Sequence, residues 1–214
     1  MSDDVQELLR RAWDDFLVLL FRQQYLTPFQ YRDATRIFGT RRSANRRYFK
    51  AAGIALDEQL PELEINSNLD DNGEPSLDNS KLGSLGVVWH SDNSYIEAPP
   101  IGSCLYTLEV PVTTGDTSFS NQYTAYETLP QDLKQRIAGR RAKHDASRNS
   151  AGVLRPGVAL PKTMADVQGP FHPLVVIHPR TQRPALYVGR RRAHPSQRRV
   201  MLCIQFQGET PVWA

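Results

Sequence analysis

From about residue 63 onward, apolar residues in this chain come in runs of strand length, and turn-forming residues separate one run from the next. The clearest run is Ser103-Cys104-Leu105-Tyr106-Thr107-Leu108-Glu109-Val110. Others span 63–65, 85–90, 172–178 and 185–188, and Pro179 and Pro184 bound the turn between the last two. Apolar runs this short, bounded by Gly, Pro, Asp and Asn, indicate strands rather than helices. The pattern therefore predicts a mainly β, barrel-like core.

Helices are predicted at the N-terminus and in one later insertion. Residues 3–15 carry apolar side chains at helical spacing, and Thr27 before Pro28 predicts a second helix that ends near Gly39. Residues 122–138 indicate two short helices, which break at Leu129-Pro130. The apolar run 16–21 has the length of a strand, and residues 143–169 form a long polar loop. Helices should therefore flank the β core rather than build it.

Length and composition exclude several classes of protein. A chain of 214 residues fits one domain that buries roughly 70% of the surface of its unfolded chain. No apolar run approaches the ~20 residues that cross a bilayer, so no membrane partner is expected. The acidic start Met1-Ser2-Asp3-Asp4 does not resemble a leader, and Cys104 and Cys203 make no disulfide framework. We therefore expect a cytoplasmic protein.

Charge is spread unevenly along the chain. Residues 1–100 carry 11 basic and 16 acidic side chains, whereas residues 101–214 carry 15 and 7. A basic half can bind nucleic acid, but here no aromatic platform or zinc-finger spacing accompanies it. We therefore expect no nucleic-acid partner, and assign the arginines to a solvated face and to an anionic small molecule.

The most specific chemical signal is His90-Ser91-Asp92, which follows the apolar run Gly86-Val87-Val88-Trp89. In an extended backbone, residues i and i+2 point to the same face, so the imidazole and the carboxylate can converge on one ion. A neutral nitrogen and an anionic oxygen are two of the three ligands that hold non-haem Fe(II). On its own a His-x-Asp is a weak signal, because such a pair more often lies in a solvated surface turn.

Several further blocks, taken in order, resemble the taurine dioxygenase/2,4-dichlorophenoxyacetate dioxygenase (TauD/TfdA) family. They are WHSDNSYIEAPPIGSCLYTLEVPVTTGDTSFSN, AKHDASRNSAG, GPFHPLVVIHPRTQRPALYVGRR and QRRVM. The resemblance implies a double-stranded β-helix, or jelly roll, spanning one domain of residues 1–214, with flanking helices and a metal at its mouth. It also implies Fe(II) with 2-oxoglutarate as co-substrate. O2 would then oxidise a small organic substrate, with release of succinate and CO2.

The same resemblance implies roles for four residues. His90 and Asp92 would be the first two iron ligands, and Thr117 and Arg199 would bind the distal carboxylate of 2-oxoglutarate. A buried dianion needs a charge-assisted partner, which a guanidinium group provides. The alternatives are an ordinary strand threonine and a surface arginine.

The chain departs from the family pattern at the third ligand. Relatives place a distal histidine a short way before the carboxylate-binding arginine, but the region around Val188 and Gly189 has none. We therefore expect an incomplete jelly roll, with a short N-terminus and an internal deletion between about 191 and 194. His194 is a candidate for the missing ligand. Two hypotheses remain open, an active dioxygenase and a catalytically impaired remnant, and unpaired sheet edges would favour a homo-oligomer. The substrate cannot be read from the sequence.

The other histidines have simpler interpretations. His144 lies in the polar loop and is expected to be exposed. His172 and His178 each precede proline near the ends of a predicted strand, so we expect them to be hydrogen-bonded structural residues.

Overall fold

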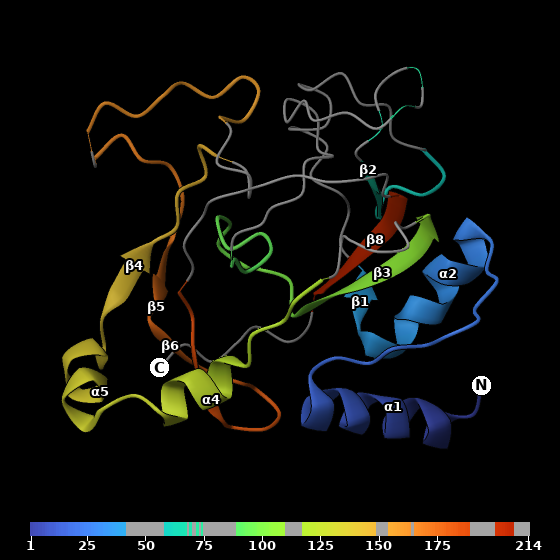
Figure 1. Ribbon diagram of the computed structural model, residues 1–214, viewed down its shortest axis with the longest axis horizontal. Helices are drawn as coiled ribbons and strands as arrows, with labels where there is room; N and C mark the ends of the chain where they lie inside the picture. Colours follow the sequence, from blue (N-terminus) through green and yellow to red (C-terminus); the bar gives the residue numbers. More distant parts are fainter. Residues whose placement is uncertain are drawn as a thin grey trace.

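The computed structural model describes residues 1–41, 58–67, 69, 72, 74, 89–109, 117–148, 154–163 and 165–188, and the backbone of 200–207. Its elements form two groups (Figure 1). One contains the N-terminal helices and a four-stranded sheet, and the other contains two short helices and two pairs of strands. Residues 89–101, drawn in green, run between the two groups (Figure 1).

The four-stranded sheet is organised around β8 (Val200–Gln207). On one edge β8 pairs antiparallel with β1 (Thr40–Arg41) and with β2 (Leu63–Ser67). On the other edge it pairs antiparallel with β3 (Gly102–Glu109), and the register shifts between Thr107 and Glu109. The partner of β3 thus comes from a segment about a hundred residues later in the chain.

Three helical segments lie beside this sheet (Figure 1). They are α1 (Asp3–Phe16), α2 (Pro28–Ala34) and the 3-10 helix η1 (Thr35–Phe38). A capping box starts α2: Thr27 accepts from the Gln30 amide, and the Gln30 side chain accepts from the Thr27 amide. Gly39, with φ of 148°, follows η1. The predicted helix from Thr27 to Phe38 is therefore confirmed, although its last turn is 3-10.

A small hydrophobic core joins α2 to the sheet. Tyr31, Leu60 and Leu63 are buried, and the Tyr31 ring stacks on Tyr106 with centroids 5.3 Å apart. The Tyr31 hydroxyl donates to the Cys104 carbonyl (2.6 Å). Burial raises the pKa of the Cys104 thiol, which is free. These contacts fix the first half of β3 against the helices.

The second group contains α4 (Gln122–Glu127), α5 (Gln131–Ile137) and four short strands. The strands pair as β4 (Arg141–Lys143) with β5 (Phe171–Pro173), and as β6 (Val175–Ile177) with β7 (Pro184–Leu186), both antiparallel. The break between α4 and α5 is as the sequence predicts. The predicted hairpin is present as β6 and β7, but the expected single strand 172–178 is divided into β5 and β6, and β5 pairs with β4 instead.

Trp13 of α1 lies where the two groups meet. A Cβ atom added at Gly102 would lie 2.3 Å from the Trp13 ring, so the start of β3 packs directly on that ring. The Arg180 guanidinium, from the turn between β6 and β7, lies 5.5 Å from the Trp13 ring centroid and forms a bidentate ion pair with Asp14. We call Trp13, Asp14, Gly102 and Arg180 the Trp13 clamp, because they connect α1, β3 and the β6–β7 turn.

One expected strand is absent, and a second, over 85–90, lies mostly outside the described residues. Residues 17–21 form no strand; Leu17 adopts left-handed backbone angles (φ 65°) and ends α1, and Phe16, Leu20 and Phe21 are exposed. Trp89 is 59% exposed and lies outside any strand, whereas residues 85–88 fall outside the described part of the chain. A strand needs a neighbour to pair with, and local apolarity alone does not supply one.

The predicted jelly roll is only partly visible. Among the described residues the strands form one four-stranded and two two-stranded sheets, which do not close into a barrel. Within the same residues, no helix is long and apolar enough to cross a membrane.

Candidate metal site

The side chains of His90 and Asp92 converge. His90 Nε2 lies 3.2 Å from Asp92 Oδ1, and the two side chains are 35% and 48% exposed. The side chains converge as predicted, although His90 and Ser91 lie outside any strand and Asp92 begins a turn. The chain reverses immediately after Asp92, where Asn93 takes left-handed angles (φ 48°) and its carbonyl accepts from the Ile96 amide (3.2 Å). We call residues 92–96 the ligand turn.

Ser103, at the start of β3, holds the carboxylate of Asp92. Its hydroxyl donates to Asp92 Oδ2 at 3.0 Å, while Oδ1 is the oxygen that faces His90. The two carboxylate oxygens are thus assigned to different partners. The Trp13 clamp fixes Gly102, the residue before Ser103, so the position of this donor depends on α1 packing.

These two donor atoms fit a divalent metal ion. Two ligands about 2.1 Å from a metal at a right angle lie about 3 Å apart, close to the His90–Asp92 separation. One imidazole nitrogen and one carboxylate oxygen suit Fe(II). Among the described residues, however, no three His, Cys, Asp or Glu side chains gather as a metal-binding group. His194 and Arg199 lie outside the described residues.

Three aromatic side chains pack together close to the ligand turn. The His144 ring stacks on Tyr187 (centroids 5.2 Å apart), and both rings meet His172 edge-on at 4.9 and 5.5 Å. We call these three residues the aromatic cluster. Burial and the negative charge of Asp92 raise the pKa of the Tyr187 hydroxyl. The cluster is therefore within electrostatic reach of the predicted metal ligand.

Two histidines of this region are hydrogen-bonded through a ring nitrogen, and a third, His144, has a buried Nε2. His172 is 2% exposed and its Nε2 lies 3.0 Å from the Ile96 carbonyl, and His178 Nδ1 accepts from the Thr181 amide, so both are structural as predicted. The expectation that His144 is exposed is wrong, since its Nε2 is buried without a hydrogen-bond partner. Burial, and secondarily the neighbouring His172, lower the pKa of His144, which favours a neutral ring.

The remaining predicted residue, Thr117, is exposed in residues 117–120, which lead into α4. The sequence did not predict Ser103, Tyr187 or the contact of His172 with Ile96. The His-Pro pairs at 172 and 178 were the only local signal for any of them. Ser103 lies eleven residues after Asp92 and Tyr187 lies ninety-five residues after it. Residues so far apart form no short motif that a sequence pattern could detect.

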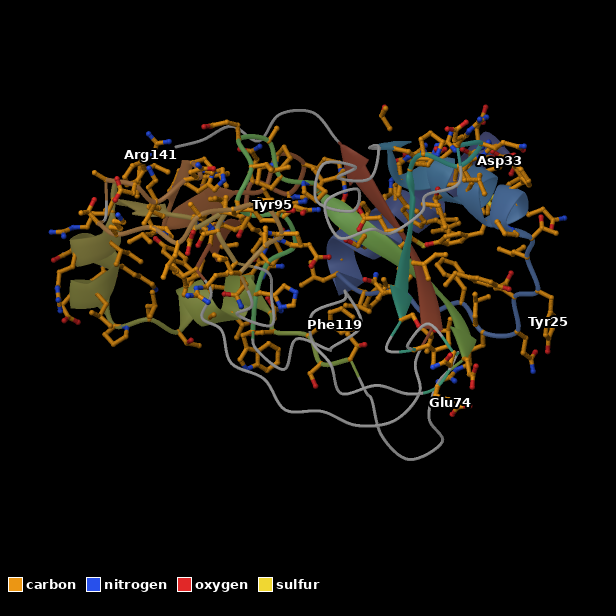
Figure 2. All side chains as sticks on the ribbon, turned by 90° about the horizontal axis from the view of Figure 1, so that it is seen from above. Tyr25, Asp33, Glu74, Tyr95, Phe119 and Arg141 are labelled. Carbon is orange, nitrogen blue, oxygen red and sulfur yellow. The ribbon has the colours of Figure 1, made fainter. Side chains whose placement is uncertain are left out.

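The loop between β4 and β5 also reaches the ligand turn. The Arg155 guanidinium lies 4.0 Å from the centroid of the Tyr95 ring, and Tyr95 is buried. Tyr95 lies near the middle of the molecule, whereas Arg141 lies at the far end of the second group (Figure 2). The ligand turn is thus contacted both by the sheet, through Ser103, and by the second group.

Comparison with known proteins gives a consistent result. Residues 1–207 match the family described as "Taurine catabolism dioxygenase TauD, TfdA family". The chain is 29% identical over 187 residues to the (S)-phenoxypropionate/alpha-ketoglutarate-dioxygenase of Sphingobium herbicidovorans, covering 85% of this chain and 61% of that enzyme. It is 30% identical over 198 residues to the alpha-ketoglutarate-dependent 2,4-dichlorophenoxyacetate dioxygenase of Cupriavidus pinatubonensis, covering 90% of this chain and 67% of the relative.

Solved structures agree on the fold. The chain superimposes on AAD-2 in complex with Mn(II) and N-oxalylglycine with a TM-score of 0.73 and 21% identity, covering 99% of this chain and 92% of that one. Relatives in this family are Fe(II)- and 2-oxoglutarate-dependent dioxygenases. The chain spans about three-fifths to two-thirds of the length of the two curated relatives.

Proposed function

Because the chain belongs to the taurine catabolism dioxygenase TauD, TfdA family, we propose that it acts as an Fe(II)- and 2-oxoglutarate-dependent dioxygenase on a small organic substrate. The observation that carries the proposal is the 3.2 Å approach of His90 Nε2 to Asp92 Oδ1, with half of the carboxylate accessible to solvent. This geometry supports two neighbouring ligands on one metal ion.

His90 and Asp92 would hold the iron, and Ser103 would orient the carboxylate so that Oδ1 faces the metal. When bound, Fe(II) with 2-oxoglutarate and O2 supplies the oxidising power that releases succinate and CO2 and oxidises a C–H bond of the substrate. Thr117 and Arg199 are proposed to bind the distal carboxylate of 2-oxoglutarate. The protein's own contribution is to bind, orient and separate the reactants.

The names of two relatives indicate which substrates to test first. The relatives named for phenoxypropionate and for 2,4-dichlorophenoxyacetate act on aryloxy acids, so these acids are the first compounds to test. We also propose that residues 1–214 form a single domain, and that this domain is cytoplasmic.

An anaerobic titration tests the proposed function. Addition of Fe(II) and 2-oxoglutarate to folded protein should produce a metal-to-ligand charge-transfer band in the visible spectrum. Asp92→Asn and His90→Gln should abolish the band. Glu97→Gln, which removes an exposed carboxylate five residues from Asp92, should leave it unchanged. A folded wild-type protein without the band would refute the proposal.

A second candidate, a catalytically impaired family member, is favoured by one observation. The described residues offer His90 and Asp92 but no third donor grouped with them. Such a protein would retain the fold and bind metal weakly without turnover. Succinate formation from 2-oxoglutarate separates the two: it requires Asp92 in an active enzyme and is absent in an impaired one.

A further inference from the structure

The ligand turn stores backbone strain directly beside a predicted metal ligand. Asn93 has φ of 48°, a left-handed conformation that non-glycine residues seldom adopt. Asparagine tolerates this conformation better than most residues, but it still costs free energy, so surrounding contacts must maintain it. The internal hydrogen bond from the Ile96 amide to the Asn93 carbonyl closes the turn without linking it to the rest of the protein.

Ser103, Arg155 and His172 each contact the ligand turn from another part of the described structure. Ser103 donates to the Asp92 carboxylate at its first residue, and Arg155 covers the Tyr95 ring near its end. His172 reaches the last residue, where its Nε2 lies 3.0 Å from the Ile96 carbonyl. Of these three contacts, only that of His172 is a hydrogen bond to the backbone of the turn.

His172 is itself held in place from several sides. It lies in the middle of β5, opposite Ala142 of β4, and Pro173 beside it is buried. The His144 and Tyr187 rings pack edge-on against its ring. With 2% exposure, the His172 ring is enclosed by its neighbours and has little room to reorient. A fixed donor 76 residues away in sequence is thus coupled to the end of a strained turn.

We propose that His172 is a positioning residue for metal binding: by donating Nε2–H to the Ile96 carbonyl it holds the ligand turn in the conformation that directs Asp92 toward His90. The effect of His172 on metal binding rests on the proposed function. Its effect on the ligand turn does not, because the hydrogen bond to Ile96 is present in the metal-free protein. Groups that hydrogen-bond a metal ligand directly typically change metal affinity by 10–100-fold when removed, and His172, which acts on Asp92 through the turn, should change it by a factor near the lower end of that range.

Two variants separate the donor from the shape of the ring. His172→Phe keeps an aromatic ring but has no donor, whereas His172→Gln keeps an N–H group. In metal-free protein, backbone amides of residues 92–97 should exchange with deuterium about tenfold faster in the Phe variant. The Gln variant should stay close to wild type. The control is His178→Phe, which removes the other His-Pro histidine, whose Nδ1 contacts only its own turn through Thr181.

The consequence for the metal is measured separately, by titration with Mn(II) followed by electron paramagnetic resonance. The Phe variant should bind Mn(II) about threefold to tenfold more weakly than the control variant. Equal exchange in residues 92–97 for the Phe and control variants would overturn the proposal. If wild-type protein binds no Mn(II), the proposed function fails, and the exchange comparison still decides the role of His172.

A measurement on the wild-type protein guards against variants that fail to fold. Nitrogen chemical shifts of the His172 ring report which nitrogen carries hydrogen. We expect Nε2 to be protonated at pH 8, because a carbonyl can only accept. A ring protonated at Nδ1 alone would overturn the proposal without any substitution.

Discussion

The ion pair between Asp14 and Arg180 allows a quantitative test of how the two groups of elements are joined. Arg180 Nε lies 2.8 Å from Asp14 Oδ2 and 3.0 Å from Oδ1, and the side chains belong to segments 166 residues apart. The Asp14 side chain is 16% exposed and that of Arg180 is 40% exposed. Exposed pairs contribute about 0.2–1 kcal/mol, and bidentate geometry with a mostly buried carboxylate raises this value. Because the guanidinium remains solvated, we expect a coupling free energy of about 1.5 kcal/mol.

A double-mutant cycle measures this coupling. Asp14→Asn keeps the shape of the carboxylate, and Arg180→Met keeps much of the aliphatic stem that lies against Trp13. For a chain of this size, each kcal/mol corresponds to about 2–4 °C in Tm, so Asp14→Asn should lower Tm by roughly 3–6 °C. Chemical unfolding of the wild type, both single variants and the double variant gives the coupling. Additive effects of the two substitutions would refute the view that this pair joins α1 to the β6–β7 turn.

Three further predictions concern the site and its support. Ser103→Ala should weaken Mn(II) binding about threefold to tenfold, because it removes one hydrogen bond to the half-exposed carboxylate of Asp92. Ser103→Thr keeps the hydroxyl and should bind Mn(II) as the wild type does. Equal affinity in all three proteins would contradict this role of Ser103. The pKa of His144 lies below its ordinary 6.5, so the unfolded chain binds more protons than the folded protein, and stability should decline as pH falls below about 6.5. Thermal melts over this pH range should show a smaller decline for His144→Phe. The same pH dependence in both proteins would count against a neutral His144 ring in the folded protein. Gly102→Ala should destabilise the protein by about 1–3 kcal/mol, because the new Cβ would overlap the Trp13 ring. A wild-type Tm in this variant would show that Trp13 does not pack tightly on Gly102.

Local signals in the sequence predicted the local elements correctly. Thr27 with Pro28 predicted the start of α2, and Leu129-Pro130 predicted the break between α4 and α5. These signals succeed because capping and proline restrictions act within a few residues. The apolar run 16–21 has the length of a strand but forms none, because strand formation requires a pairing partner that the run itself does not specify.

The candidate site could be predicted only as far as its residues are neighbours in sequence. His90 and Asp92 were identified from their spacing, and they do converge, although neither lies in a strand among the described residues. The burial of His144 could not be predicted, because the rings that cover it come from β5 and from Tyr187. A residue in a polar loop is normally solvated, and only the tertiary structure reverses this expectation.

The central claim is that His90 and Asp92 bind one metal ion, and Mn(II) binding to histidine-labelled protein tests it most directly. In protein carrying 15N-histidine, pulsed electron paramagnetic resonance of bound Mn(II) should detect coupling to an imidazole nitrogen. His90→Gln should remove the part of that coupling that comes from His90, and Asp92→Asn should weaken binding by more than tenfold. Binding of Mn(II) with the same affinity and the same nitrogen coupling in both variants would contradict the account.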